Sequence, residues 1–193
     1  MGPQTIAKFL NVSDDNLYLR ERATETNVKS IDLSNSKVIS FATHGLIAGE
    51  ITGLAEPALV LTPPETGSTE DDGLLTASEI TQLNLNADWI LLSACNTAAG
   101  ETLEAEGLSG LARAFIYAGA RSMLVSHWAV ESNATTKLTT GIFKELQKDP
   151  DMDRAEALQQ SMLNLMTNTQ NTNYAHPAFW APFSLVGDGL PIN

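Results

Sequence analysis

The sequence predicts an α/β protein in which a mostly parallel sheet carries helices on both faces. Short runs rich in apolar and β-branched residues alternate along the chain with segments of helical periodicity, which is the order that βαβ units produce. One of these runs, Trp89 to Ser93 (WILLS), is continuously apolar, as are strands buried on both faces of a parallel sheet. The length of 193 residues fits a single domain.

Local signals mark the boundaries of the predicted elements. Apolar residues recur at helical spacing in Gly107 to Ala118, and Gly119 then ends the helix. Asp153 and Glu156 form a capping-box pattern before the last helix. Thr62 to Gly73, rich in Pro, Gly, Thr and acids, is predicted to be a loop. We expect strands over Asn16 to Leu19, Lys37 to Thr43, Leu59 to Leu61, Trp89 to Ser93, Arg121 to Ser126 and Phe183 to Val186, and helices over Gly107 to Ala118, Ala134 to Leu146 and Arg154 to Met166.

The charge distribution argues against two classes of partner. Eleven basic and 23 acidic residues give a formal net charge of -12, which disfavours nucleic-acid backbones and anionic membranes. No segment reaches the roughly 18 consecutive apolar residues of a membrane span. Between Lys37 and Arg113 there is no Lys or Arg but there are 11 acids. Such a stretch is typical of a solvated acidic face, and the alternative is a field that attracts cationic substrates.

Metal and cofactor motifs are absent from the sequence. One cysteine and three scattered histidines, with no HExxH motif, argue against a zinc site and exclude an internal disulfide. No phosphate-binding loop and no G-x-G-x-x-G occurs, so we expect no cofactor. The pair Asp71-Asp72 precedes a glycine, which is more typical of a turn than of a Ca²⁺ site. The amino terminus lacks the pattern of a secretory signal, so we expect a cytoplasmic protein.

Chemically able residues follow three of the predicted strands. His44 comes directly after the strand ending at Thr43, Cys95 follows the strand ending at Ser93, and His127 follows the strand ending at Ser126. In open α/β sheets, ligands and catalytic groups gather outside the carboxyl ends of the strands. If the first two strands are parallel neighbours, His44 and Cys95 emerge side by side.

A histidine beside a cysteine forms a nucleophilic dyad. The imidazole of His44 can take the thiol proton of Cys95 and leave a thiolate, while the backbone amides of Gly45 and Cys95 can bind the oxyanion of a tetrahedral intermediate. The alternative for Cys95 alone is a buried small apolar residue, and for His44 alone a structural hydrogen-bond partner. Their joint position at strand ends favours the dyad.

Five sequence blocks, in order, resemble those of the CHAT domain, a caspase-like peptidase domain often found after tetratricopeptide repeats and related to separase and caspases. The resemblance extends from about Tyr18 to Gly189. The blocks are FATHG (Phe41 to Gly45), DDGLLTASEI (Asp71 to Ile80), LLSACNTAAGE (Leu91 to Glu101), EGLSGLARAFIYAGARSMLVSHWAV (Glu106 to Val130) and HPAFWAPFSLVGDG (His176 to Gly189).

This resemblance implies a caspase-like three-layer sandwich that cleaves peptide bonds with His44 as the base and Cys95 as the nucleophile. Residues 1–193 then form one CHAT domain whose substrate is a protein or peptide. The rival interpretation is a catalytically silent module of the same fold that signals by binding and is controlled by upstream repeats.

The resemblance also indicates where a substrate lies. Ser126, His127 and Trp128 belong to the segment along which substrate binds in this fold, so we expect them to contact the peptide. His127 departs from the pattern of many relatives, and the alternative is a surface or packing histidine; Trp128 is alternatively a core residue. Glu131 stands where separase-like enzymes have an acid, so we expect a preference for Arg or Lys before the scissile bond.

The chain begins late relative to the family. Members of this fold have a first strand inside the sheet, whereas here only Gln4 to Leu10 precedes the strand expected over Asn16 to Leu19, and this short segment resembles the end of the first helix. We therefore expect the carboxyl-terminal portion of a longer protein, with an upstream tetratricopeptide-repeat region or a regulatory subunit completing the sheet. A genuinely short variant is the alternative.

Overall fold

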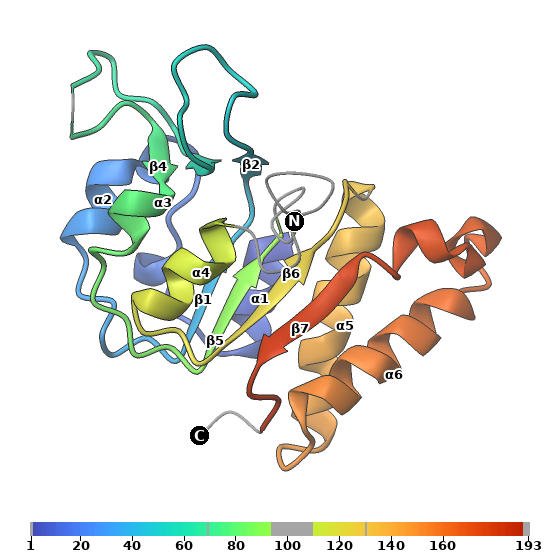
Figure 1. The fold of residues 1–193 in the computed structure, drawn as a ribbon. Helices are drawn as coiled ribbons and strands as arrows, with labels where there is room; N and C mark the ends of the chain where they lie inside the picture. Colours follow the sequence, from blue (N-terminus) through green and yellow to red (C-terminus); the bar gives the residue numbers. More distant parts are fainter. Residues whose placement is uncertain (1, 69, 94–109, 130, 191–193) are drawn as a thin grey trace.

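The computed structural model describes residues 2–68, 70–93, 110–129 and 131–190 (Figure 1). Strands and helices alternate between residues 74 and 148, as the sequence predicts, whereas the four strands between residues 38 and 76 follow one another without a helix. The helices and strands are α1 (Gly2–Phe9), α2 (Glu25–Ser30), β1 (Val38–Phe41), β2 (His44–Leu46), β3 (Ala58–Val60), β4 (Leu74–Thr76), α3 (Ala77–Ile80), β5 (Trp89–Leu92), α4 (Gly110–Tyr117), β6 (Ser122–Ser126), α5 (Ser132–Lys148), α6 (Arg154–Met166) and β7 (Phe183–Gly187), with 3-10 turns at Asp14–Asn16, Arg20–Arg22, Thr172–Ala175 and Pro177–Phe179.

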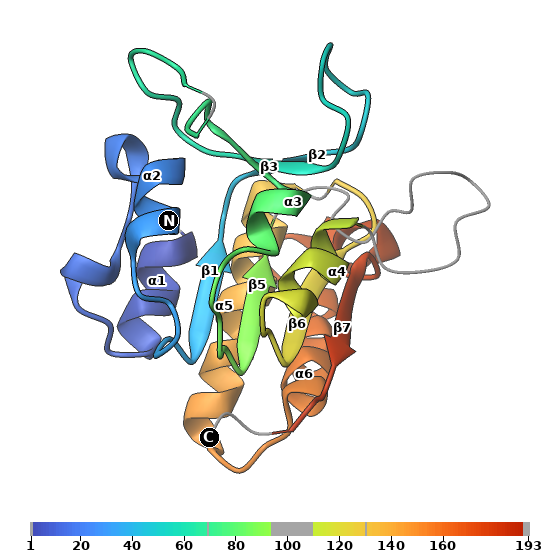
Figure 2. The same cartoon turned by 60° about the vertical axis from the view of Figure 1, so that its left-hand side comes forward.

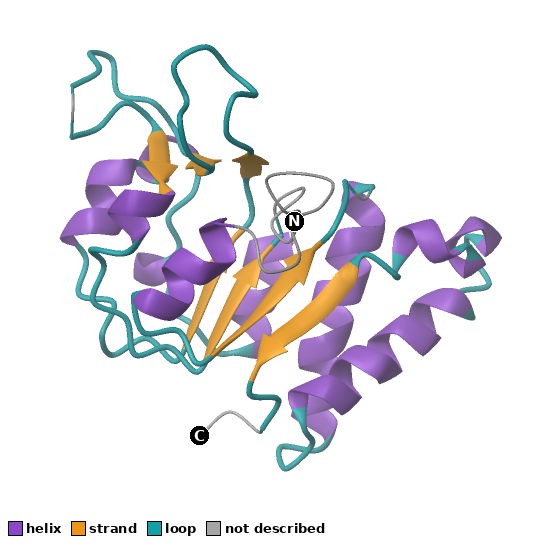
Figure 3. Cartoon of the chain, in the orientation of Figure 1, coloured by secondary structure: helices purple, strands orange, loops and turns teal. Residues whose placement is uncertain are grey.

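The main sheet has the strand order β1-β5-β6-β7. β1, β5 and β6 are parallel, and β7 runs antiparallel to β6, which confirms the predicted mostly parallel sheet. A second, smaller sheet with the order β2-β3-β4 is antiparallel throughout. It lies beyond the carboxyl end of β1 (Figure 3).

Helices cover both faces of the main sheet, which makes a three-layer sandwich (Figure 2). On one face, Ile90 and Leu92 of β5 join a core with residues of α3 and α4. On the other face, Trp89 and Leu91 join a core with residues of α1, α5 and α6. The run WILLS is continuously apolar because both faces of β5 are buried: its four residues are at most 1% exposed.

The predicted helix ends hold in part. Gly119 follows α4 with φ +111°, a conformation that favours glycine, and a Cβ there would lie 2.1 Å from the Leu85 carbonyl oxygen. Asp153 is the N-cap residue of α6, but its side chain accepts no capping hydrogen bond, so the predicted capping box does not form. Helices α2 and α3 and strands β2 and β4 were not predicted.

The strand predicted over Asn16 to Leu19 is wrong. Asp14–Asn16 forms a 3-10 turn, and residues 17–19 are irregular. The Ser13 hydroxyl accepts a hydrogen bond from the backbone N–H of Asp15. Short polar side chains that bond to the local backbone in this way compete with strand pairing.

A network of charged side chains closes the amino end of the main sheet. Arg154, only 1% exposed, donates to the Asp88 carbonyl oxygen and to the Asp188 carboxylate at 3.0 Å. Arg121 bridges both acids, at 3.1 Å from Asp88 and 3.4 Å from Asp188. Burial lowers the pKa of Arg154, and the nearby carboxylates of Asp188 and Asp88 act in the opposite direction. The network connects α6 to the beginnings of β5 and β6 and to the segment after β7.

None of the helices in the described ranges is long and apolar enough to cross a membrane.

Candidate active site

The carboxyl ends of β1, β5 and β6 meet at one edge of the main sheet (Figure 1). β1 and β5 are in register, with Phe41 opposite Leu92, and the N–H of Ser93 donates to the Phe41 carbonyl at 3.0 Å. The carboxyl ends of β1 and β5 therefore lie side by side. This is the strand arrangement on which the predicted dyad depends.

His44 begins β2, three residues beyond Phe41. It stands opposite Val60 of β3, and the hydroxyl of the preceding Thr43 donates to the Val60 carbonyl oxygen. The His44 side chain is exposed, and its imidazole makes no hydrogen bond or ion pair with any other residue that the structure describes. The strand β2 thus fixes the backbone of His44 while the imidazole remains available to a reactant.

Gly45 follows His44 within β2, opposite Leu59. The residue is only partly exposed. Cys95, for which we predicted the roles of nucleophile and of second oxyanion donor, lies outside the described residues. The arrangement of the dyad and of the oxyanion hole therefore stays a prediction.

Ser126 is the last residue of β6 and is buried, opposite Phe183 of β7. His127 continues this pairing, because its N–H donates to the Pro182 carbonyl at 3.0 Å. Its imidazole Nε2 lies 3.1 Å from the hydroxyl oxygen of Ser184 on β7. His127 therefore has a structural partner on the side of β6 away from β5, a contact that no sequence pattern around Ser184 indicated.

Trp128 is 43% exposed, so the alternative of a core residue is wrong. Its indole N–H is 3.4 Å from the Ala178 carbonyl oxygen. This contact orients the indole while leaving part of the ring at the surface, where it is accessible to a bound peptide.

Glu131 is the N-cap residue of α5. Its carboxylate accepts hydrogen bonds from the backbone N–H groups of Asn133 at 2.9 Å and Ala134 at 2.8 Å. The hydrogen bond from the Asn133 N–H lowers the pKa of Glu131 most; partial burial opposes it, and the bond from Ala134 adds to the lowering, so the pKa lies below its ordinary value. The side chain is exposed and carries a negative charge at neutral pH.

Asp71 and Asp72 have structural partners in the described part of the chain. The Asp71 carboxylate accepts from the backbone N–H of Thr26 at 3.1 Å and from its hydroxyl, while Asp72 accepts from the N–H of Leu74 at 2.9 Å. The second bond closes a turn around Gly73, whose φ is +86°. The turn interpretation is confirmed, and among the described residues no group of three or more His, Cys, Asp or Glu side chains is arranged to hold a metal ion.

Comparison with known proteins agrees with this architecture. The family model described as the CHAT domain matches residues 3–188. The mouse protein named tetratricopeptide repeat protein 28 is 27% identical over 201 residues, and its human counterpart is 26% identical over 205 residues. In both cases the match covers 89% of this chain and 8% of the relative. The chain thus corresponds to a small part of two much longer proteins named for their repeats.

Proposed function

Because the chain belongs to the CHAT domain family, a caspase-like family, we propose that it is a cysteine endopeptidase with His44 as general base and Cys95 as nucleophile. The observation that carries the proposal is the in-register parallel pairing of β1 with β5. His44 is three residues beyond Phe41, and Cys95 is three residues beyond Leu92, its register partner, in the sequence. In an extended conformation, a residue two positions beyond Ser93 can lie up to about 7 Å from it.

The proposed reaction is acyl transfer to the Cys95 sulfur. His44 takes the thiol proton, and the thiolate attacks the carbonyl carbon of the scissile peptide. The resulting oxyanion accepts hydrogen bonds from the amides of Gly45 and Cys95. The His44 imidazolium then protonates the leaving amine, and water, deprotonated by His44, hydrolyses the thioester and restores the free thiol.

The proposed substrate is a peptide with Arg or Lys before the scissile bond. Glu131 supports this preference because its carboxylate is exposed and its lowered pKa keeps it charged. Its two oxygens accept backbone bonds at the start of α5, and the exposed carboxylate is accessible to a cationic side chain. Ser126, His127 and Trp128 are the proposed backbone and side-chain contacts of the peptide.

The second candidate function is a catalytically silent interaction module. The observation that favours it is the edge of β1: among the described residues, β1 pairs with β5 alone, so its other side is free to accept a strand. An upstream repeat region or a regulatory subunit is the proposed source of that strand, consistent with relatives that are named for tetratricopeptide repeats. Either function is proposed to operate in the cytoplasm.

A peptide library, digested by the chain and read by mass spectrometry across all bonds, tests the peptidase. Cys95→Ala and His44→Ala are the test variants, and His176→Ala is the matched histidine control because its imidazole accepts a capping hydrogen bond and is given no role in the reaction. Cleavage after Arg or Lys by the chain and by the control, lost in both test variants, supports the proposal. Cleavage that survives Cys95→Ala would refute it.

If the chain cleaves nothing, the library is repeated in the presence of the proposed upstream repeat region or regulatory subunit. Activity that appears only then, and disappears in Cys95→Ala, supports a peptidase completed from outside. Continued silence, with retained binding of the upstream region, favours the interaction module.

A further inference from the structure

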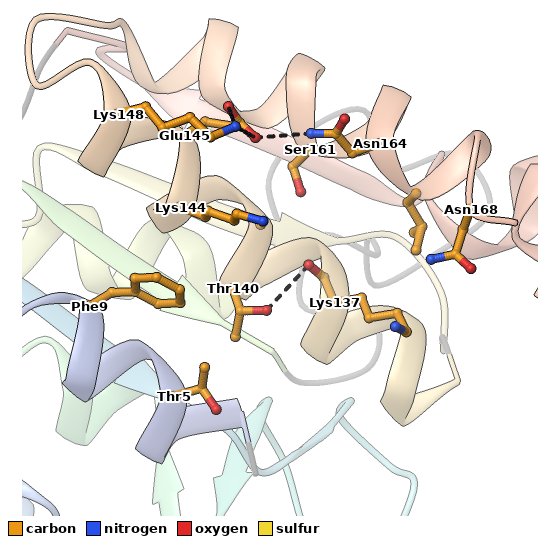
Figure 4. A pocket seen from close by; sticks show the side chains of 12 residues that line it. Thr5, Phe9, Lys137, Thr140, Lys144, Glu145, Lys148, Ser161, Asn164 and Asn168 are labelled. Carbon is orange, nitrogen blue, oxygen red and sulfur yellow. Dashed lines mark hydrogen bonds and ion pairs between the residues drawn. The ribbon is translucent and has the colours of Figure 1, made fainter. Parts of the chain in front are cut away.

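A cavity of about 490 Å³ lies among α1, α5 and α6, within the helix layer on one face of the main sheet (Figure 4). One stripe of α5 forms its floor, with α6 on one side and α1 on the other. This is the opposite face of the sheet from α3 and α4. The cavity shares no residue with the candidate active site.

The lining is basic although the chain is strongly acidic. The chain contains six lysines and has a net charge of -12, yet three of those lysines line this one cavity: Lys137, Lys144 and Lys148. All three belong to α5, at spacings of seven and four residues, which places them along one side of the helix. The positive charge at the cavity therefore comes from three lysines on one side of α5.

One of these charges is already neutralised. Glu145, 8% exposed, accepts two hydrogen bonds from the Lys148 ammonium, at 2.8 and 2.7 Å, and one from the Asn164 amide at 3.0 Å. The side-chain ammonium groups of Lys137 and Lys144, by contrast, make no hydrogen bond or ion pair within the parts of the chain that the structure describes. Two unpaired ammonium groups thus remain at the cavity.

Asn168 adds a neutral donor on the α6 side. Its side-chain oxygen accepts from the backbone N–H groups of Gln170 at 3.0 Å and Asn171 at 2.9 Å. This fixes the amide, so its NH₂ group is left to donate elsewhere, and Asn168 lines the cavity together with the two lysines (Figure 4). Phe9 and Leu165 supply apolar surface.

Gly141 holds the two long helices in close contact beside the cavity. A Cβ at this position would lie 2.3 Å from the Ser161 hydroxyl oxygen, and that hydroxyl donates to the Leu138 carbonyl at 2.7 Å. The cavity is therefore formed between rigidly packed helices rather than by a surface loop.

We propose that this cavity binds a small multivalent anion whose two negative groups, phosphate or carboxylate, pair with Lys137 and Lys144. The two residues are seven positions apart, which corresponds to about 10.5 Å along the helix axis. A molecule with two anionic groups can pair with both ammonium groups without the two lysine side chains converging on one point, whereas a single phosphate requires them to converge. A volume of about 490 Å³ falls within the usual range of roughly 300 to 1,000 Å³ for small-molecule sites.

Isothermal titration of the chain with inorganic tripolyphosphate, citrate and inorganic phosphate, at low and at moderate salt, tests this proposal. The test variant is the double substitution Lys137→Gln with Lys144→Gln. The matched control is Arg20→Gln with Arg113→Gln, which removes the same charge from two exposed side chains outside the cavity. Both doubles are checked by thermal unfolding.

We expect tripolyphosphate or citrate to bind more tightly than inorganic phosphate, and the test double to weaken that binding by roughly 10-fold to 100-fold while the control changes it little. The tighter of the two probes identifies phosphate or carboxylate as the preferred group. Equal weakening in both doubles would overturn the proposal, because it would show a response to net charge alone. Absence of small-anion binding, or binding of a glutamate-rich peptide alone, would also overturn it.

Discussion

The two ends of the main sheet use charged and polar side chains in opposite ways. At the amino end, the buried Arg154 pairs with the Asp188 carboxylate and donates to the Asp88 carbonyl oxygen, and Arg121 pairs with both acids. At the carboxyl end, His44 and Trp128 are exposed, and the His44 imidazole has no partner among the described residues. The two ends therefore have different roles: charged side chains that bond to one another connect strands and helix at the amino end, whereas an imidazole without a partner at the carboxyl end remains free to react.

The largest predicted effect is on activity at the carboxyl end. His44→Ala should slow cleavage of the best library peptide by roughly 10²- to 10⁴-fold, because it removes the general base. The melting temperature should stay close to that of the unmodified chain, since the imidazole is exposed and makes no hydrogen bond or ion pair with any other described residue. Initial rates and thermal unfolding measure the two quantities, with His127→Ala as a second histidine variant. An unchanged rate in His44→Ala would show that the His44 imidazole is not the general base.

The next largest effect is on stability at the amino end. Arg154→Met should lower the free energy of unfolding by about 3 kcal/mol, because Asp188 and the Asp88 carbonyl lose a buried charged donor. Urea unfolding measures the change, and Arg113→Met, an exposed arginine on α4, is the control. A loss no larger than that of the control would mean that the network adds nothing to the stability of the sheet.

Two glycines with positive φ allow the stability cost of a steric contact to be compared with the cost of the backbone conformation alone. Gly119, beside the amino end, should tolerate alanine poorly, with a loss of about 1 to 3 kcal/mol, because the new Cβ meets the Leu85 carbonyl oxygen. Gly49, in the loop after β2, has φ +79° but open space around it, so alanine there should cost only about 1 kcal/mol of backbone strain. Chemical denaturation of both variants tests this. Equal losses would show that the conformation, and not the contact, dominates.

The smallest effect on stability is expected at Glu131. Glu131→Gln should lower the free energy of unfolding by about 0.5 to 1 kcal/mol at neutral pH, because the helix amides lose a charged acceptor. Since the folded-state pKa of Glu131 is lowered, its contribution is present above its unfolded pKa and is lost as pH falls through the folded value. The two stability curves should therefore converge in acid.

The same substitution tests substrate preference. Glu131→Gln should raise KM for peptides with Arg or Lys before the scissile bond and change KM little for neutral analogues. A KM that is unchanged for both classes would assign Glu131 a purely structural role as the cap of α5.

The sequence revealed the main sheet because its strands carry dense apolar runs. WILLS predicts β5 from composition alone, and the 3.6-residue periodicity identifies Arg154–Met166 to the residue. The small sheet could not be predicted, since β2 and β4 have three residues each and are strands only in the context of β3. Their pairing depends on contacts distant in sequence, which periodicity does not encode.

The candidate site was predictable to the extent that it follows strand ends. His44 and Trp128 lie where that rule puts them, at the carboxyl ends of β1 and β6. The contact between His127 and Ser184 was not predictable, because it requires the antiparallel addition of β7 beside β6. The grouping of the α5 lysines was not predictable either, because they line one cavity only when α1 and α6 pack beside that helix.

Activation of the Cys95 thiol by His44 is tested by the rate of Cys95 alkylation with iodoacetamide, measured as a function of pH. The chain has a single cysteine, so the signal comes from one site. We predict rapid alkylation near neutral pH that falls in His44→Ala and is retained in His176→Ala. An alkylation profile that follows an ordinary thiol pKa of roughly 8.5, identical with and without His44, would contradict the account.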